Sequence, residues 1–278
     1  MASSLSEALE IVVKTDPGMV RSHNEDSVFG NPHGGLVVLA DGMGGYNAGE
    51  VASGMATTVL STELEAAFLA RSPDTRADDG TSYAHVAIRD LVTKTNSAIF
   101  NAAESQPQYA GMGTTLVLAL FHDNKVTAAH IGDSRLYRLR DGDFAQLTRD
   151  HSLLQEQIDA GMISVEDARH SQNKNLVTRA LGVDPEVEAE ICDYEVLPGD
   201  IYLLCSDGLN DMVEDEEIGS TVQMLAANLE LAATQLVDMA NDNGGRDNVS
   251  VILVRIKNAF PAAPARQGWL ARLLAWLR

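Results

Sequence analysis

The chain has little of what marks a secreted, membrane-spanning or zinc-binding protein. Its 278 residues include only two cysteines, Cys192 and Cys205, and their positions do not match a zinc-binding spacing. We therefore expect reduced thiols in a cytoplasmic protein rather than a disulfide framework. Residues 1–10 show no basic start followed by an apolar stretch, so no secretory signal is indicated. No segment approaches the roughly 20 apolar residues that span a bilayer.

Basic residues are also scarce. The 40 Asp and Glu residues outnumber the 20 Lys and Arg residues, which gives a net charge of -20 at pH 7. Such a charge repels nucleic-acid phosphates and disfavours a nucleic-acid partner, whereas bound cations would offset part of it. A nucleotide-binding protein is disfavoured as well, because the chain has neither a Gly-x-Gly-x-x-Gly register nor a lysine that completes a phosphate loop.

The length allows one large domain or two small ones, and the composition does not change before about residue 257. We therefore predict one domain over 1–257 and a tail over 258–278. The sequence contains no internal repeat and no low-complexity tract.

Apolar runs bounded by Gly, Asp and Asn predict the strands. We expect them at 8–14, 25–29, 35–40, 114–122, 125–131, 135–140, 144–147, 187–194, 200–205 and 249–256. Helical spacing predicts helices at 47–69, 83–103, 214–226 and 229–241. Turn residues at 123–124 and 141–143 make 114–147 an antiparallel meander. Strands gathered around two central helices, without βαβ alternation, predict an α+β fold: a β-sandwich of two mainly antiparallel sheets flanked by helices.

Three aspartates stand in matching contexts. Asp41-Gly42 and Asp207-Gly208 each end an apolar run, and Asp247 comes just before another. A single Asp-Gly pair is more often a plain turn, which is how we interpret the pair at 141–142. The joint pattern instead predicts carboxylates held rigidly at strand ends, where they can converge on hard divalent cations.

Four short clusters carry a resemblance to a known family. They are 18–26, 41–45, 131–135, and the pair formed by 206–208 with 246–248. In order and spacing they resemble the metal-dependent protein phosphatases, the type 2C serine/threonine phosphatases, over roughly 11–256. Supporting stretches at 113–115, 147–152 and 178–182 look like the bacterial members.

The resemblance implies a site for two metal ions. Asp41 would bridge both ions, with the carbonyl oxygen of Gly42 completing one site. Asp207 and Asp247 would bind the other ion directly. Because every proposed ligand is an oxygen atom, we expect Mn²⁺ or Mg²⁺.

Further residues receive roles from the same resemblance. Glu25 and Asp26 would act through metal-bound waters, and Asp133 would contact a third, weaker ion. Arg21 would grip the phosphate bidentately, which suits a planar guanidinium better than lysine. A hydroxide shared by the two ions would attack phosphorus and displace a seryl or threonyl oxygen.

The implied function is hydrolysis of phosphoserine and phosphothreonine in proteins, opposing a Ser/Thr kinase. Phosphorylated proteins, including such a kinase or its targets, would be the partners of a monomeric enzyme. The alternative is a catalytically silent pseudophosphatase that binds phosphoprotein without turnover. The ligand positions are filled by aspartate and Arg21 is present, which favours the catalytic interpretation.

The donor of the leaving-group proton is open. Eukaryotic relatives have a histidine directly after the Asp-Gly pair, where this chain has Met43. A metal-bound water is the first candidate and His23 the second. The more frequent role for a lone loop histidine such as His23 is simply a solvated side chain.

Other residues have plainer interpretations beside the functional ones. We expect His130 to be buried or half-buried within its strand. Asn47 is a better candidate for a helix cap than, with Tyr46, for a substrate contact. Arg135 and Arg179 could steer a phosphopeptide or form structural ion pairs. Segment 161–175 resembles the mobile flap of the family, and an ordinary surface loop has the same composition.

The tail begins with a proline-containing linker at 261–265. Its apolar residues fall on one helical face: Trp269, Leu270, Leu273, Leu274 and Leu277. With a basic flank, this face suggests a helix that contacts a membrane surface or a protein partner. The alternative is packing on its own domain or fraying, because about ten residues make a marginal helix.

Overall fold

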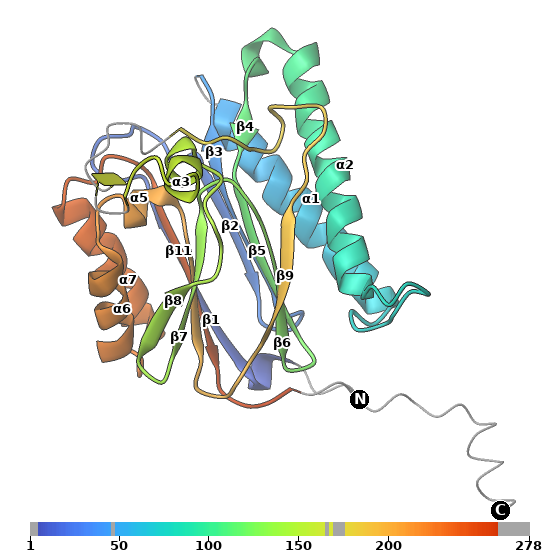
Figure 1. Cartoon of the computed structure of the whole chain (residues 1–278), viewed down its shortest axis with the longest axis vertical. Helices are drawn as coiled ribbons and strands as arrows, with labels where there is room; N and C mark the ends of the chain where they lie inside the picture. Colours follow the sequence, from blue (N-terminus) through green and yellow to red (C-terminus); the bar gives the residue numbers. More distant parts are fainter. Residues whose placement is uncertain (1–4, 46–47, 165–166, 169–175, 261–278) are drawn as a thin grey trace, which may run out of the picture.

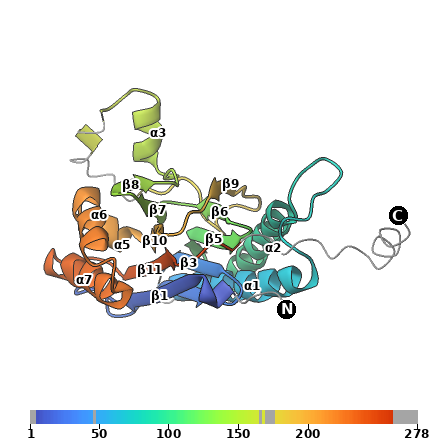
Figure 2. The same cartoon turned by 90° about the horizontal axis from the view of Figure 1, so that it is seen from below.

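The computed structural model of the chain describes residues 5–45, 48–164, 167–168 and 176–260. Within these ranges, two antiparallel β-sheets face each other, and a pair of long helices covers the outer face of each (Figure 1). Figure 2 shows the resulting four layers from below. The predicted α+β fold, a β-sandwich of two antiparallel sheets flanked by helices, is confirmed.

The first sheet has the strand order β1-β11-β10-β7-β8. Its strands are β1 (Leu9–Asp16), β11 (Val249–Ile256), β10 (Ile201–Cys205), β7 (Arg135–Arg140) and β8 (Asp143–Gln146). The helices on its outer face are α6 (Asp215–Met224) and α7 (Leu229–Asp242). The short helix α5 (Asp207–Asn210) follows β10 directly.

The second sheet has the order β2-β3-β5-β6-β9, and β4 pairs with the end of β3. Its strands are β2 (Asp26–Asn31), β3 (Leu36–Met43), β4 (Gly113–Thr114), β5 (Leu116–His122), β6 (Lys125–Ile131) and β9 (Glu190–Glu195). Its outer face is covered by α1 (Ala48–Ala70) and α2 (Tyr83–Ser105). The remaining elements are the 3-10 turns η1 (Leu5–Glu7) and η2 (Pro107–Tyr109), and α3 (Leu153–Asp159), which stands apart from the layers in Figure 2.

The apolar runs of the sequence are explained by burial on both faces of each sheet. Along β3, Val37 and Leu39 enter the core between the sheets, whereas Leu36, Val38 and Ala40 pack under α1 and α2. The side chains of β11 alternate in the same way between the core between the sheets and the face covered by α7. An antiparallel strand covered on both faces needs no polar side, so its sequence is a continuous apolar run.

One predicted feature is wrong. The expected meander over 114–147 divides between the two sheets, because β5 and β6 pair in one sheet whereas β7 and β8 pair in the other. The crossing takes place at 132–134, where Gly132 has φ +100°. The turn that carries Asp133 therefore lies between the sheets rather than in a hairpin. Both hairpins themselves fit the turn prediction, with Asp141 at φ 51° and Gly142 at φ 87°.

Several predicted strand ends also differ, and two of the differences bear on the site. β3 continues through Asp41 to Met43 instead of ending at residue 40, and the strand expected at 114–122 is interrupted at Thr115. No helix within the described ranges is long and apolar enough to cross a membrane.

Candidate active site

Asp41 is held by side chains rather than by an unbroken strand ladder. Its backbone N–H donates to Thr115 Oγ1 at 3.0 Å. Its carbonyl oxygen accepts from Thr114 Oγ1 at 2.9 Å and from the backbone N–H of Thr115 at 2.9 Å. These bonds explain the break between β4 and β5. They involve only the backbone of Asp41 and not its carboxylate.

Glycines bring α1 up to this strand end. A Cβ atom on Gly42 would lie 2.2 Å from the carbonyl oxygen of Gly49, at the start of α1. Because any larger residue would clash with backbone, the Asp-Gly pair is required here for close packing rather than for a turn. Gly42 also donates its N–H to the carbonyl oxygen of Glu25 at 3.2 Å, which joins the loop before β2 to the same place.

Asp26 lies directly opposite Asp41 in the β2–β3 ladder. One of its carboxylate oxygens, Oδ2, accepts a hydrogen bond from Ser206 Oγ at 2.8 Å. The other, Oδ1, is buried and has no hydrogen-bond partner. Burial raises the pKa of Asp26 to about 6, against hydrogen bonds that lower it.

Asp207 and Asp247 come from neighbouring strands of the other sheet. Asp207 begins α5 after β10, and Asp247 precedes β11. A Cβ on Gly208 would lie 2.0 Å from the carbonyl oxygen of Asn248, so glycine allows the two segments to touch. Asn248 fixes the contact from the far side, since its Oδ1 accepts from the backbone N–H of Glu25 at 2.7 Å.

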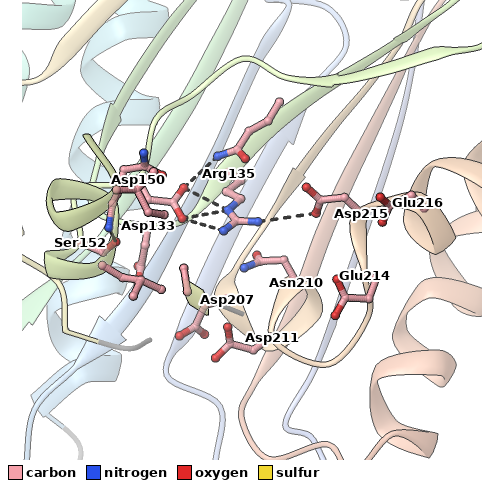
Figure 3. Close-up of a pocket in the computed structure, with 15 residues that line it drawn as sticks. Asp133, Arg135, Asp150, Ser152, Asp207, Asn210, Asp211, Glu214, Asp215 and Glu216 are labelled. Carbon is pink, nitrogen blue, oxygen red and sulfur yellow. Dashed lines mark hydrogen bonds and ion pairs between the residues drawn. The ribbon is translucent and has the colours of Figure 1, made fainter. Parts of the chain in front are cut away.

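Asp133 is buried in the crossing between the sheets. It lines, with Asp207 and Asp211, a cavity of about 290 Å³ that α3 flanks with Leu154 and Ile158 (Figure 3). Burial, followed by the negative charge of Asp150, raises the pKa of Asp133 to about 6.

The carboxylates act on one another. Burial raises the pKa of Asp41 well above its ordinary value, and the charges of Asp26, Asp207, Asp133 and Asp247 raise it further. The pKa of Asp207 is raised by burial and by four carboxylates, of which Asp133 contributes most. The structure therefore brings five predicted site residues from distant segments into one mutually repelling group.

Arg21 and Glu25 lie at the edge of this group. The Nη2 atom of Arg21 donates to Asp247 Oδ2 at 2.6 Å, while 53% of the Arg21 side chain is exposed. Burial raises the pKa of Glu25, and the charges of His23 and Arg21 oppose that shift. His23 is bonded to Ser22 Oγ at 2.8 Å and has its Nε2 3.7 Å from Glu25 Oε1.

Two of the open interpretations are now decided for the described residues. Arg135 donates bidentately to Asp150, with its Nη2 2.7 Å from Oδ2, and its Nη1 lies 3.6 Å from Asp215 Oδ1 (Figure 3). It is therefore a structural ion-pair partner. His130 is buried, as expected. The predicted cap Asn47 and Tyr46 lie outside the described residues, as do parts of segment 161–175 and all of 261–278. Arg179 is exposed.

The sequence analysis missed several residues that complete the site. Asp211 acts electrostatically on both Asp133 and Asp207, and it caps the C-terminus of α5, one helical turn after Asp207. Asp211 lies four residues after Asp207, which places the two on the same side of a helix. This signal depends on recognising residues 207–210 as helical. Asn248 and Thr115 lie in the motif stretches 246–248 and 113–115, but the sequence pattern assigns a role to neither.

The residues fit divalent metal ions. Carboxylates that are partly buried and repel one another need positive charge nearby. Arg21 supplies one such charge to Asp247, but Arg135 is already paired with two other carboxylates. The buried, unpartnered Oδ1 of Asp26 is a further oxygen that lacks a donor. An all-oxygen set of this kind suits Mg²⁺ or Mn²⁺ rather than a softer metal.

Comparisons with known proteins agree with this arrangement. The sequence profile described as protein phosphatase 2C matches residues 20–243. The serine/threonine phosphatase stp of Listeria welshimeri is 40% identical over 247 residues, which cover 87% of this chain and 93% of that protein. The serine/threonine protein phosphatase PstP of Mycobacterium tuberculosis is 40% identical over 248 residues, 89% of this chain. The chain spans 45% of the length of that relative.

Solved structures give the same result. The Mycobacterium tuberculosis phosphatase PstP/Ppp superposes with a TM-score of 0.80 at 38% identity, over 90% of this chain and 100% of that one. The PstP catalytic domain in complex with two manganese ions has a TM-score of 0.77 at 38% identity, over 90% and 99%. The chain belongs to the protein phosphatase 2C family. The enzyme class predicted from the sequence, a protein serine/threonine phosphatase, is the class of this family.

Proposed function

We propose that the chain hydrolyses phosphoserine and phosphothreonine in proteins and thereby opposes a Ser/Thr kinase. The observation that carries the proposal is the group of five carboxylates, gathered from separate strands of two sheets, with Arg21 at its edge. The solved PstP catalytic domain is in complex with two manganese ions, which supports the proposal of a two-metal centre in this chain.

The carboxylates divide the work of holding the ions. Asp41 would contact both ions, with the carbonyl oxygen of Gly42 completing one site, and Asp207 and Asp247 would hold the other. Mn²⁺ and Mg²⁺ both suit these ligands. The backbone bonds of Asp41 support a ligand role, because they fix the main chain from which the carboxylate extends.

Three further carboxylates would act around that centre. Glu25 and Asp26 would hold water molecules of the ions, and the unpartnered Oδ1 of Asp26 would accept one such hydrogen bond. Asp133 would hold a third, weaker ion at the cavity it shares with Asp211.

The chemistry divides between ions and chain. When bound, the ions would lower the pKa of water and so supply a hydroxide nucleophile for in-line attack on phosphorus. Arg21 would bind the phosphoryl oxygens. Its Nη2 reaches Asp247, so the guanidinium is already directed toward the carboxylate group. His23 lines the same hollow of about 370 Å³ as Arg21 and Glu25. It remains the second candidate, after a water, for donating the proton to the leaving oxygen.

Partners follow from the same proposal. The enzyme would act as a monomer on phosphorylated proteins, including a Ser/Thr kinase or its targets. The residues at 261–278 would form a contact with a membrane surface or with a protein.

Turnover of p-nitrophenyl phosphate and of a phosphothreonine peptide tests the proposal, with and without Mn²⁺, in wild type and Asp207→Asn. We expect Mn²⁺-dependent turnover that the substitution reduces by about a thousandfold or more, because an essential ligand is lost. Metal binding by calorimetry without any turnover would instead identify a phosphoprotein-binding pseudophosphatase.

A further inference from the structure

Two buried histidines lie behind the turn that carries Asp133. His130 is the penultimate residue of β6 and is 5% exposed, and His151 follows β8 and is 7% exposed. Their rings stack with centroids 4.7 Å apart and planes 23° apart. His130 Nε2 lies 2.8 Å from the carbonyl oxygen of Arg149, and this hydrogen bond fixes the ring of His130. The proposed chemistry uses neither histidine.

His151 bonds both backbone polar groups of Gly132, the N–H and the carbonyl oxygen. Its backbone N–H donates to the carbonyl oxygen of Gly132 at 2.9 Å. Its ring atom Nδ1 accepts from the backbone N–H of Gly132 at 3.2 Å. Gly132 has φ +100°, a conformation that other residues rarely adopt, so the turn depends on such external bonds.

The same turn is joined to the strand that carries Asp41. Ser134 Oγ and Thr115 Oγ1 are 2.7 Å apart, and Thr115 Oγ1 accepts the backbone N–H of Asp41 at 3.0 Å. A Cβ on Gly132 would lie 2.8 Å from the side chain of Thr115, so the turn presses against that residue. His151 is thus connected through the turn to two of the proposed ligand positions.

The tautomer of His151 follows from these contacts. Burial lowers the pKa of His151 to about 4, so the ring is neutral near pH 7. Because Nδ1 accepts from Gly132, the proton of the neutral ring is on Nε2. That atom is buried, has no hydrogen-bond partner, and points toward Glu190 Oε2 at 3.7 Å.

A metal ion is the alternative occupant of this place. The ligand atoms of His130, His151 and Glu190 lie within 4.8 Å of one another. However, a metal would need the lone pair of Nε2 on His151 while Nδ1 still accepts from Gly132. A neutral imidazole cannot supply both lone pairs. The bond from Gly132 therefore favours a hydrogen-bonding role.

We propose that His151 is a positioning residue that holds the Gly132 turn and thereby sets the place of the Asp133 carboxylate. This inference rests on the proposed function. It assigns a role to His151, which the proposed chemistry does not use. Glu190, which pairs with His130 across β6 and β9, has its carboxylate near Nε2 of His151 but beyond hydrogen-bond distance, so the bond from Gly132 is the one that orients the ring.

The test combines His151→Leu, His151→Asn and Asp133→Asn with a double mutant of His151→Leu and Asp133→Asn. Asparagine can place an acceptor oxygen near the position of Nδ1, whereas leucine cannot. The control is His122→Asn, because His122 is also buried in this sheet but is bonded 2.8 Å from Thr127, away from the turn. The measurements are kcat and KM against Mn²⁺ concentration, Mn²⁺ binding by calorimetry, and Tm.

We expect His151→Leu to raise the Mn²⁺ concentration needed for half-maximal kcat by about tenfold. The affinity of the weakest Mn²⁺ site, measured by calorimetry, should fall by about the same factor. His151→Asn should recover most of the loss. In the Asp133→Asn background, His151→Leu should have no further effect, because the group through which it acts is gone. His122→Asn should lower Tm without changing the metal dependence.

Equal effects of His151→Leu with and without Asp133 would overturn the proposal, as would wild-type metal dependence in Asp133→Asn or in a folded His151→Leu. A wild type without turnover would count against the proposed function instead. The positioning role would then be decided by the calorimetric titration alone, with the same comparison of variants.

Discussion

At the scale of single residues, the carboxylates of the proposed active site lower the stability of the fold. Asp41 and Asp207 are partly buried, and each is surrounded by further carboxylates whose charges raise its pKa. Without a cation, these charges oppose folding, because each would be more stable in water and away from the others.

Asp207→Asn should therefore stabilise the metal-free protein while it removes activity. We expect a rise of about 1–2 kcal/mol in the free energy of unfolding, since a repelling charge is replaced by a neutral amide. Urea unfolding in the presence of a chelator measures this change in the free energy of unfolding. The matched control is Asp238→Asn on the exposed side of α7, which should change stability little. A loss of stability in Asp207→Asn would contradict the repulsion argument.

Arg21 leads to a second prediction at this scale. Arg21→Ala should lower kcat/KM for a phosphothreonine peptide by about a hundredfold, because a charge-assisted, bidentate contact with phosphate is lost. Arg21→Lys should recover little of this loss, because an ammonium group cannot reproduce the fork geometry. Full activity in the lysine variant would show that charge alone is sufficient.

At the scale of elements, helix ends set where the layers begin. The side chain of Asn228 caps α7 by accepting the backbone N–H of Leu231 at 3.1 Å. Apolar residues of α7 such as Leu236 then pack on the outer face of the first sheet. The cap lies at the outer layer, away from the carboxylates.

Asn228→Ala should cost about 1 kcal/mol of stability and leave kcat unchanged. Asn228→Ser should retain most of the stability, because serine also accepts from the first turn of a helix. Chemical unfolding together with p-nitrophenyl phosphate turnover separates the two effects. A fall in kcat at unchanged Tm would mean that the outer layer affects the site directly.

At the scale of the whole molecule, the folded body extends past the domain boundary that the sequence predicts. The sequence predicts a domain over 1–257, whereas Phe260 is buried in the core between the sheets. The backbone N–H of Phe260 donates to Asn124 Oδ1 at 2.6 Å. Phe260 thus ties the end of β11 back to the β5–β6 hairpin.

A chain ending at residue 260 should keep full activity on p-nitrophenyl phosphate, because the role proposed for the tail is partner contact rather than chemistry. A chain ending at 257 should be less stable by about 2–4 kcal/mol, since a buried aromatic side chain is removed. Thermal unfolding of the two chains makes the comparison. Lost activity in the longer one would remove the docking role proposed for 261–278.

The sequence by itself determined most strands and the four long helices, and it predicted the aspartates that the fold brings together. These depend on local pattern: apolar runs predict buried strands, and Asp-Gly pairs at their ends place rigid carboxylates. The strand over 249–256 agrees with β11 in both ends.

Only the tertiary structure decided how distant segments meet. The chain changes sheets between β6 and β7, which put Asp133 between the layers, and no local signal encodes that choice. Likewise Arg135 pairs with Asp150, and His151 bonds Gly132, 19 positions earlier in the chain. Such contacts depend on how the two sheets pack, and packing is a property of the whole chain, which short-range pattern does not specify.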